Sequence, residues 1–594
     1  MDIAGVSESL KRFGWPDYLV FILMLALCSA IGVFFGWQDH VKHKKMRGRK
    51  VRRGSEALEY LVGGRKMKVF PVAMSLVASL ISGIGLLGTS TEIYLYGTQY
   101  CFILIGVVLM GLVLHFFYLP VYHELKLTSL YEYLSRRFDN RIRLFGSLVF
   151  VLSTVVKMPI MIYVPALSFS AVTGVNIHIT TPVVCAITVF YTSVGGIKAV
   201  VWTDVIQSVV MIFALIMVAV KATFAVGGLG TVLQINYDSG RIEPPIWDIN
   251  PTIRSTIWTT VIGGWVFHCA INGICQSMVQ RYVSLPTLRD ARKAVWIFVA
   301  GVFVLLGLSM YNGLLLYAIY HDCDPLTTGL VKKKDQLVPL LVMQILGDYP
   351  GLAGCFIAGV FSASLSSLST GLNSITAVIL EDFIKPYRKS ALSEKATAII
   401  MKSTVIVLGT LSTGMVFIVE KLGPVLQLAI TFAGVTYGPL LGIFTIGFVM
   451  PYIDSTETII GAGFGLLCST LIVYFTQMDV ASGRLVFPEK PTSVENCTYA
   501  FDNSTLLTKS FDDIETPEAK FYHVSYLYYS LIGTTVTIVV ANLCALIFGK
   551  RDVENVDPAL LSPIVRKFFM KEKMEMKEYL KVETNDMIKR SESM

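Results

Sequence analysis

Long runs of apolar residues are the feature that most limits what this chain can fold into. A helix needs ~20 largely apolar residues to cross the hydrocarbon core of a bilayer. Runs of that length recur along nearly the whole chain. The sequence therefore predicts an all-α polytopic membrane protein with about 13 transmembrane helices. They are expected near residues 16–36, 69–92, 100–120, 145–170, 178–194, 200–222, 254–277, 294–319, 338–380, 403–420, 424–450, 456–476 and 525–548, the ninth of them with a short leading helix.

The composition excludes most other classes of protein. Hydrophobic residues make up 54% of the 594 residues and charged residues 15%, whereas a typical soluble domain carries about 25% charge. Disordered chains and coiled coils need more charge than this. The first apolar run is too long for a secretory signal peptide, and no small-residue cleavage site follows it.

Basic residues predict the orientation, because Lys and Arg favour cytoplasmic loops. Strict alternation of the spans places 36 of the 50 Lys and Arg residues on one side. They are Lys198 and the basic residues of segments 41–68, 121–143, 280–293, 381–402 and 549–594. The net charge of +8 is thus explained by membrane topology and attraction to anionic lipid, and no nucleic-acid partner is expected.

Two N-glycosylation sequons test the orientation independently. They begin at Asn496 and Asn503, in a loop that the alternation places outside. Glycans are added on the lumenal side, so both tests predict an extracellular amino terminus and a cytoplasmic carboxyl terminus. Cys323 and Cys497 also lie in outer loops, where oxidation is possible, and the sequence leaves open whether they pair.

Two segments predict helix interruptions near the middle of the membrane. Unwound backbone is tolerated there only around a cavity, so such segments point to a binding site in a transporter. One lies in the second predicted span, with serines at 75, 79 and 82 and glycines at 83, 85 and 88; the other, residues 361–370, carries six hydroxyl side chains. Freed carbonyls and hydroxyls would suit a singly charged hard cation such as Na⁺. Close helix packing through small residues is the alternative for each segment.

A run of fixed residues resembles a known family. Residues 191–207 match Y-T-x-x-G-G-x-x-A-V-x-W-T-D-x-x-Q, the signature of the sodium/solute symporters. The resemblance covers roughly residues 15–550, and the Glu-x-Tyr-x-x-Gly pattern at 92–97 is similar to the monocarboxylate, multivitamin and iodide branch. Supporting matches are Ser366-Ser367 with Asn373-Ser374, Val279-Gln280-Arg281-Tyr282 and Gly438-Pro439-Leu440-Leu441-Gly442.

The resemblance implies a LeuT-like fold, in which two five-helix repeats of inverted topology form a ten-helix core. It implies a sodium site between the first and eighth core helices, with Asp204 inward of it to help sodium leave. An interfacial carboxylate at a helix start is the alternative for Asp204. The implied sodium ligands are the backbone carbonyls of Ala78, Ile81 and Ala363 and the hydroxyls of Ser366 and Ser367.

The resemblance places the substrate beside sodium, between the first, third, sixth and tenth core helices. His268 is an ionisable group inside a span, and such groups are usually functional; a satisfied buried histidine is the alternative. For Tyr163 and Tyr437 the alternative is simple helix packing. The candidate substrate-binding residues are Ser82, Gly85, Lys157, Tyr163, His268, Gln276 and Tyr437.

Lys157 departs most from the family pattern. It lies about twelve residues into the fourth predicted span, about 18 Å along the helix, where a charged lysine costs roughly 2.5–3.5 kcal/mol. Three hypotheses remain: it pairs with an anionic substrate, it replaces a second sodium ion, or it is satisfied structurally. A second departure is Cys275, where the family often has Asn, because a thiol is a poor sodium ligand.

The sequence predicts a plasma-membrane sodium symporter for a small organic anion, working by alternating access, with Na⁺ as coupling ion and no other cofactor. Another solute (iodide, choline or a sugar) or a non-transporting substrate sensor is the alternative. No H-E-x-x-H, P-loop or Cys-x-x-Cys motif is present, so enzymatic activity is not expected, and protein partners cannot be deduced. The expected division is an outer amino terminus with the first span (1–36), a basic cytoplasmic segment (37–68), the transport core (69–450), a further span (451–476), a glycosylated outer loop (477–524), the last span (525–548) and a cytoplasmic tail (549–594).

Overall fold

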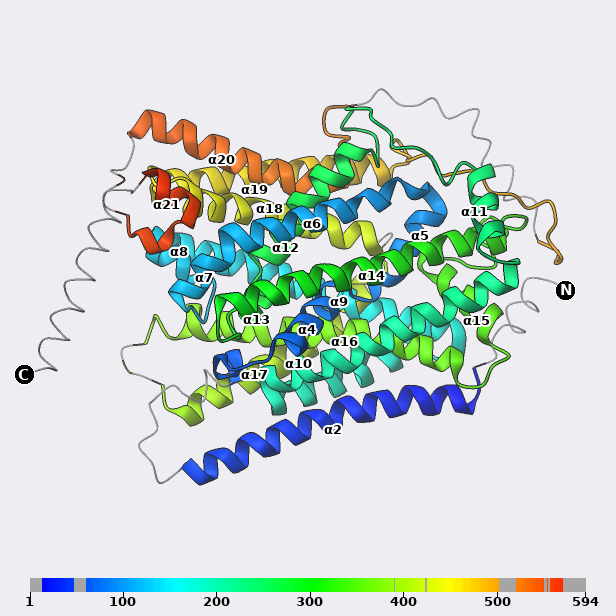
Figure 1. The fold of residues 1–594 in the computed structure, drawn as a ribbon, viewed down its shortest axis with the longest axis horizontal. Helices are drawn as coiled ribbons and strands as arrows, with labels where there is room; N and C mark the ends of the chain where they lie inside the picture. The colour runs from blue at the N-terminus through cyan, green and yellow to red at the C-terminus, as the bar shows by residue number, and fades with distance from the viewer. Residues whose placement is uncertain are drawn as a thin grey trace, which may run out of the picture.

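The computed structural model describes residues 13–46, 60–388, 390, 392–421, 425–501, 520–549, 553 and 556–569. The described part of the chain is a bundle of helices that run along one common direction (Figure 1). Ten of its helices are long and apolar enough to cross a membrane, and one bent pair brings the number to as many as eleven. The prediction of an all-α polytopic membrane protein is confirmed, whereas the predicted count of thirteen spans is not.

Most predicted spans correspond to single long helices. The third is built from four consecutive short helical segments, η2 Thr98–Phe102, α6 Ile103–Val113, η3 Leu114–Tyr118 and α7 Leu119–Leu125. The ninth has the expected short leading helix, α15 Leu337–Leu346, before α16 Leu352–Val378. The other long helices are α2 Trp15–Met46, α9 Asn140–Thr173, α14 Leu288–Tyr320, α17 Glu394–Val419, α18 Val425–Val449, α19 Ser455–Ala481 and α20 Tyr529–Phe548.

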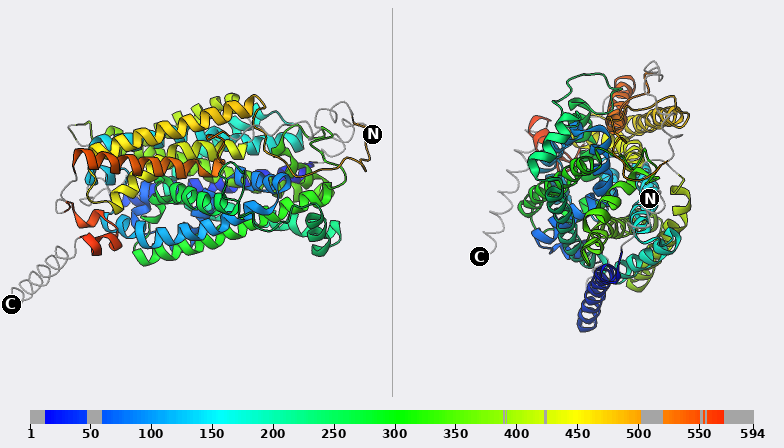
Figure 2. Two further views of the ribbon diagram at one scale, coloured as in Figure 1. Left: turned by 90° about the horizontal axis from the view of Figure 1, so that it is seen from above. Right: turned by 90° about the vertical axis from the view of Figure 1, so that its right-hand side faces the viewer.

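Short elements mark the two ends of the bundle. One end carries α11 Leu229–Asp238, and the opposite end carries α8 Glu132–Arg137 and α21 Pro563–Phe569 (Figure 1). The helix α2 lies at the edge of the bundle and stands out from it in the end-on view of Figure 2. It contacts α10 Ile177–Val226 and α16, and many of its other side chains are exposed, as expected for a helix that faces lipid.

The helix α10 contains two predicted spans, 178–194 and 200–222, and bends between them at Gly196. This glycine has φ 57° and ψ −156°, a conformation that side chains with a Cβ rarely adopt. A Cβ there would lie 2.7 Å from the ring of Tyr60. The Tyr60 hydroxyl donates to the carbonyl of Thr192 at 3.0 Å, which satisfies one backbone group beside the bend.

The second predicted span is broken as expected. Two residues separate helix α4 Val69–Leu80 from α5 Gly83–Tyr96, and the two halves are bent by 57°. Ile81 and Ser82, which link them, have extended backbone conformations. The carbonyls at the end of α4 therefore lack the usual helical partners.

A second break occurs where the sequence analysis did not predict one, in the seventh predicted span. This span begins with the π-helical turn η4 Thr259–Gly263 and continues as α12 Gly264–Gly273. Cys275 is extended and precedes α13 Gln276–Tyr282. The signal for this break is Gly273, two residues before Cys275.

The predicted interruption at residues 361–370 is wrong, because α16 is a continuous helix from Leu352 to Val378. Several of its hydroxyls are satisfied within the helix itself. The Ser367 hydroxyl donates to the carbonyl of Ala363 at 3.1 Å, and the Ser369 hydroxyl donates to that of Ser366 at 3.0 Å. Such bonds let hydroxyl residues remain helical, so the composition alone did not decide the backbone.

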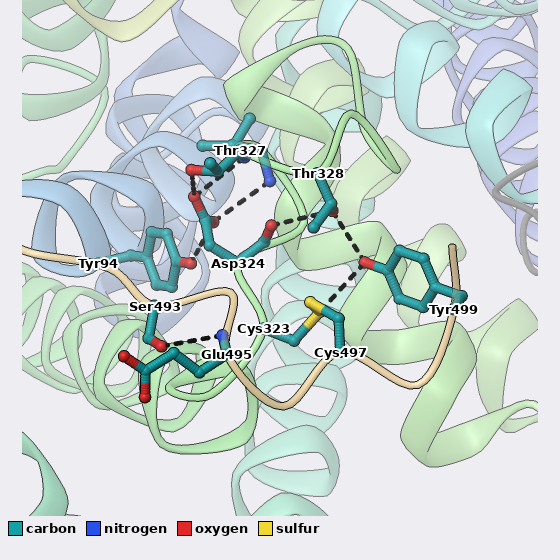
Figure 3. Close-up of a disulfide and its surroundings, with 10 residues drawn as sticks. Tyr94, Cys323, Asp324, Thr327, Thr328, Ser493, Glu495, Cys497 and Tyr499 are labelled. Carbon is teal, nitrogen blue, oxygen red and sulfur yellow. Dashed lines mark hydrogen bonds between the residues drawn. A yellow bond between two sulfur atoms is a disulfide. The ribbon is translucent and has the colours of Figure 1, made fainter. Parts of the chain in front are cut away.

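A disulfide between Cys323 and Cys497 fastens the loop between α19 and α20 to the segment that follows α14 (Figure 3). Beside it, the Thr328 and Tyr499 hydroxyls are 2.8 Å apart. The same loop reaches α5, because the Lys490 backbone N–H donates to the Leu95 carbonyl at 2.7 Å. The sequence left open whether these two cysteines pair. They form a disulfide between positions 174 residues apart.

We expect the double substitution Cys323→Ser with Cys497→Ser to lower the free energy of unfolding by about 2–4 kcal/mol, because the disulfide restrains the unfolded chain. Thermal unfolding of the purified protein in detergent measures the change. Serine at 497 preserves the sequon at Asn496, so glycosylation is not a confounding difference. Cys468→Ser, which removes a free cysteine, is the control; an equal effect of both variants would contradict the prediction.

Candidate functional site

The break between α4 and α5 lies against α16. Gly83 allows this approach, because a Cβ there would meet the Ser364 hydroxyl at 2.7 Å. The Ser367 hydroxyl lies 3.4 Å from the carbonyl of Ser79, and the Ser79 and Thr370 hydroxyls are 2.9 Å apart. The two segments that the sequence singled out for their hydroxyls therefore meet inside the protein.

The predicted sodium ligands belong to these two segments and are all buried. Ala78 and Ile81 come from the end of α4, and Ala363, Ser366 and Ser367 come from α16. The Ser366 Oγ is buried without a hydrogen-bond partner among the described residues. This hydroxyl and the carbonyls freed at the end of α4 are oxygen donors of the type that a monovalent hard cation needs.

A buried ion pair lies next to this region. Asp204 of α10 and Arg281 of α13 approach to 3.2 Å, and both side chains are buried. Ser75 of α4 donates to Asp204 Oδ2 at 2.5 Å and accepts from Arg281 Nε at 2.6 Å. Arg281 also donates to Thr370 of α16, so the cluster joins α4, α10, α13 and α16.

A second buried ion pair lies at the other end of the same broken helix. Glu92 of α5 accepts two hydrogen bonds from Arg254, at 2.8 and 2.9 Å. The Arg254 guanidinium is also 4.1 Å from the centre of the Tyr96 ring, and the Tyr526 hydroxyl is 3.4 Å from Glu92 Oε1. The pair ties α5 to the segment that precedes η4 and α12.

The site analysis of the sequence did not include Arg281, Glu92 or Arg254, although each left a signal. Arg281 lies in one of the family matches, and Glu92 begins the Glu-x-Tyr-x-x-Gly pattern. Arg254 begins the seventh predicted span. All three are ionisable residues in or beside apolar runs, where charges are rare and usually paired.

A cavity of about 120 Å³ lies beside the break between α4 and α5. Four of the seven predicted substrate-binding residues line it, namely Ser82, Gly85, Lys157 and His268. Such a volume is well below the roughly 300–1,000 Å³ of pockets for drug-sized ligands. The cavity therefore suits a solute of few heavy atoms. The remaining lining residues are Ser79, Leu80, Ile81, Ile84, Thr89, Tyr100, Phe267, Ile271, Asn272, Met278, Leu306, Ala429, Ile430 and Ala433.

Among the described residues that line this cavity, Lys157 is the only lysine or arginine. Within the described part of the chain, its ammonium group makes no hydrogen bond or ion pair with another side chain. Lysine has three donors and no acceptor, so an ammonium in this position is matched by an anion or by water. This arrangement favours the hypotheses that give Lys157 a charged or hydrated partner in the cavity.

The other three predicted substrate-binding residues do not line this cavity. The Tyr163 hydroxyl accepts a 2.5 Å hydrogen bond from Lys333. Gln276 accepts from the Leu130 backbone N–H at 2.7 Å and donates to the Thr128 carbonyl at 3.0 Å, which holds a loop in place. The Tyr437 hydroxyl lies 3.5 Å from the Cys275 sulfur, so Cys275 and Tyr437 contact each other.

The predicted glycosylation sites are only partly described. Asn496 is exposed, and its backbone N–H donates to the Asp322 carbonyl at 3.3 Å. Asn503 lies outside the described residues. The basic segment 47–53 and most of the predicted tail also lie outside them.

We expect Asp204→Asn to destabilise the protein by about 3–5 kcal/mol, because it leaves the Arg281 charge buried without an opposite charge. The double variant with Arg281→Gln should recover some of this loss, which thermal unfolding of the two single variants and the double variant measures. Thr203→Val is the control, since its hydroxyl bonds only to carbonyls of its own helix. Additive losses in the double variant would contradict the prediction.

Comparison with known proteins identifies the family of this chain. The pattern of the "Sodium:solute symporter family" matches residues 60–461. The chain is 36% identical to sodium-coupled monocarboxylate transporter 1 of Xenopus laevis, covering 90% of this chain and 85% of the relative. It is 36% identical to the human protein of that name (91% and 88% covered) and 34% identical to the human sodium/iodide cotransporter (92% and 86% covered).

The solved structure of a Na⁺-coupled sialic acid symporter has a similar fold, with a TM-score of 0.71, 21% identity, and coverage of 91% of this chain and 99% of that chain. The LeuT-like fold class is thereby confirmed. The matched relatives are transporters, which also confirms that the chain is not an enzyme. The chain belongs to the sodium:solute symporter family and is a multi-span, sodium-coupled solute symporter.

Proposed function

We propose that this symporter carries a small organic anion of the monocarboxylate type together with sodium. The observation that carries the proposal is the Lys157 ammonium on a small cavity, beside the break of a membrane helix. Inside a membrane an unmatched ammonium is costly, and a carboxylate would supply both the opposite charge and the acceptors that Lys157 lacks. The names of the matched monocarboxylate transporters support the same substrate class.

The proposed sodium site uses the carbonyls of Ala78, Ile81 and Ala363 and the hydroxyls of Ser366 and Ser367. The approach of Ser367 to Ser79 and the unpartnered Ser366 hydroxyl support it. The same break also borders the cavity through Ile81 and Ser82. Sodium that orders this break would therefore raise the affinity for the anion, which is a linkage between two sites that share one element.

Alternating access is the proposed transport cycle. The ion pair Glu92–Arg254 holds the outer half α5, and the cluster of Asp204, Arg281 and Ser75 holds the inner half α4. Opening toward one side would separate the residues of one cluster while the other cluster stays closed. Asp204 would then help sodium leave, because its carboxylate lies beside the inner half of the broken helix.

The proposed location is the plasma membrane, with the amino terminus outside. The disulfide Cys323–Cys497 supports an outer position for the loop 477–524, because disulfides persist in oxidising compartments. The exposed Asn496 in the same loop supports it as well. The proposed domain division follows the same orientation, with residues 69–450 as the transport core.

Iodide is the second candidate substrate. The 34% identity to the human sodium/iodide cotransporter favours it, and a monovalent halide would also match the charge of Lys157. Iodide offers no directional acceptor pair, whereas a carboxylate has two oxygens that accept several hydrogen bonds. Competition between iodide and a monocarboxylate for sodium-dependent uptake separates the two candidates, and a non-transporting sensor would bind without uptake.

We expect Ser366→Ala and Ser367→Ala each to raise the sodium concentration for half-maximal uptake roughly tenfold or more, because contacts to a charged group contribute about 1.5–3 kcal/mol. Sodium-dependent uptake of lactate in cells that express the protein measures this. Thr376→Ala is the control, since its hydroxyl bonds to the Leu372 carbonyl of the same helix. An unchanged sodium dependence in both serine variants would refute the site.

We expect Lys157→Gln to raise the KM for lactate at least tenfold, since it removes a buried charge–charge contact with the anion. Uptake with varied lactate at saturating sodium measures KM, and Lys221→Gln, whose ammonium stacks on Tyr349, is the control. If Lys157 instead replaces a second sodium ion, the variant changes the charge moved per substrate. Unchanged lactate uptake would exclude anion pairing.

A further inference from the structure

Asn272, which lines the same cavity, carries a hydrogen-bond acceptor without a partner among the described residues. It lies on α12, two residues before the unwound position Ile274–Cys275, and it is one of the cavity's lining residues. The residue is fully buried, and its Oδ1 has no hydrogen-bond partner among the described residues. Leaving a buried acceptor unpaired is unfavourable, so the group calls for a partner that the described residues do not supply.

The orientation of the Asn272 amide is fixed by its neighbours. Its Nδ2 donates to the His268 carbonyl at 2.9 Å and lies 3.5 Å from His268 Nδ1. If the amide were flipped, its oxygen would face the His268 carbonyl at that distance, and two acceptors repel each other. The Asn272 Nδ2 therefore donates within α12, and its Oδ1 is the atom left without a hydrogen-bond partner among the described residues.

Lys157 and Asn272 thus offer complementary groups to one small cavity. The ammonium of Lys157 can only donate, and the free Asn272 Oδ1 can only accept. The volume of about 120 Å³ suits a ligand of few heavy atoms, in which an anionic end and a donor are a few bonds apart. Ser82 also lines the cavity. Its hydroxyl can donate or accept, so it does not discriminate between a ligand that carries a donor and one that carries an acceptor.

We propose that Asn272 makes this symporter selective for hydroxy-monocarboxylates over keto-monocarboxylates. The carboxylate of the substrate pairs with Lys157, and its hydroxyl donates to Asn272 Oδ1. A keto acid presents a second acceptor and leaves Asn272 Oδ1 unpaired. A site whose buried polar group is left unpaired by a ligand discriminates strongly against that ligand. This inference rests on the proposed transport of a small organic anion.

Competition among L-lactate, pyruvate and propionate tests the inference on the unaltered protein. The three share a three-carbon skeleton, and only lactate carries a hydroxyl donor beside the carboxylate. We expect the KM for sodium-dependent uptake of lactate to be roughly 5- to 50-fold lower than that of pyruvate or propionate. Equal KM values, or a lower KM for pyruvate, would overturn the inference without any variant being made.

Asn272→Leu should bring the ratio of the lactate and pyruvate KM values to within about threefold of unity, mainly by raising the KM of lactate. Asn312→Leu is the matched control, because Asn312 is also buried with an unpartnered Oδ1 but does not line the cavity. A ratio that Asn272→Leu leaves unchanged would overturn the inference. If the variant does not reach the cell surface, the three-acid comparison on the unaltered protein decides.

The proposed function and the inference fail in different ways. If none of the three acids is taken up with sodium, the proposed anion substrate is wrong, and the inference falls with it. If all three are taken up and Lys157→Gln weakens each of them while the hydroxyl makes no difference, the proposed function stands and only the role of Asn272 is refuted. A lactate preference that depends on Asn272 supports both.

Discussion

The structure depends on one constraint, which is that backbone polar groups inside a bilayer must find partners within the protein. At the end of α4 the helical partners are missing, and hydroxyl-bearing residues of α16 lie against the freed carbonyls. Gly83 is needed for this approach because any side chain would meet Ser364. The break and the hydroxyl-rich helix are therefore one structural unit. The freed carbonyls account for the hydroxyl residues of α16, and the close approach of α16 accounts for the glycine at the break.

Two buried ion pairs extend this unit to the ends of the broken helix. Their arginines, Arg254 and Arg281, flank α12 and so belong to the opposite ends of the second broken helix. Each half of one interrupted helix is thus tied to the corresponding half of the other. Paired charges at these depths are stable together and costly when separated, which makes them suited to holding one of two alternative arrangements.

The length of the apolar runs predicted a polytopic helical protein, and hydroxyl content singled out the two polar segments. That these segments meet was implied by the family resemblance. The sequence predicted the break between α4 and α5, missed the break before α13, and wrongly predicted one in α16. Residues 361–370 remain helical, and two of their six hydroxyls, those of Ser367 and Ser369, bond to carbonyls of the preceding turn. The seventh span breaks at Ile274–Cys275 with fewer polar residues. Whether a segment unwinds depends on its tertiary contacts, which the amino-acid sequence alone does not show.

The candidate site was predicted in the same uneven way. Ser82, Gly85, Lys157 and His268 line the cavity, and their signals were local: a weak helix or an ionisable group within a span. Tyr163, Gln276 and Tyr437 were chosen by family position, and the structure gives each of them other contacts. Asn272 was not considered, because a buried asparagine becomes informative only when both of its amide atoms can be traced to partners.

The bridge between Cys323 and Cys497 has a consequence for how the protein is made. Its two halves are 174 residues apart, and at ~5–20 residues per second a ribosome needs about 9–35 s to add that length. During this interval Cys323 cannot yet pair with Cys497, because the chain between them, which contains several further helices, is still being made. Closure of the bridge therefore requires that the later helices leave Cys497 on the same side of the membrane as Cys323.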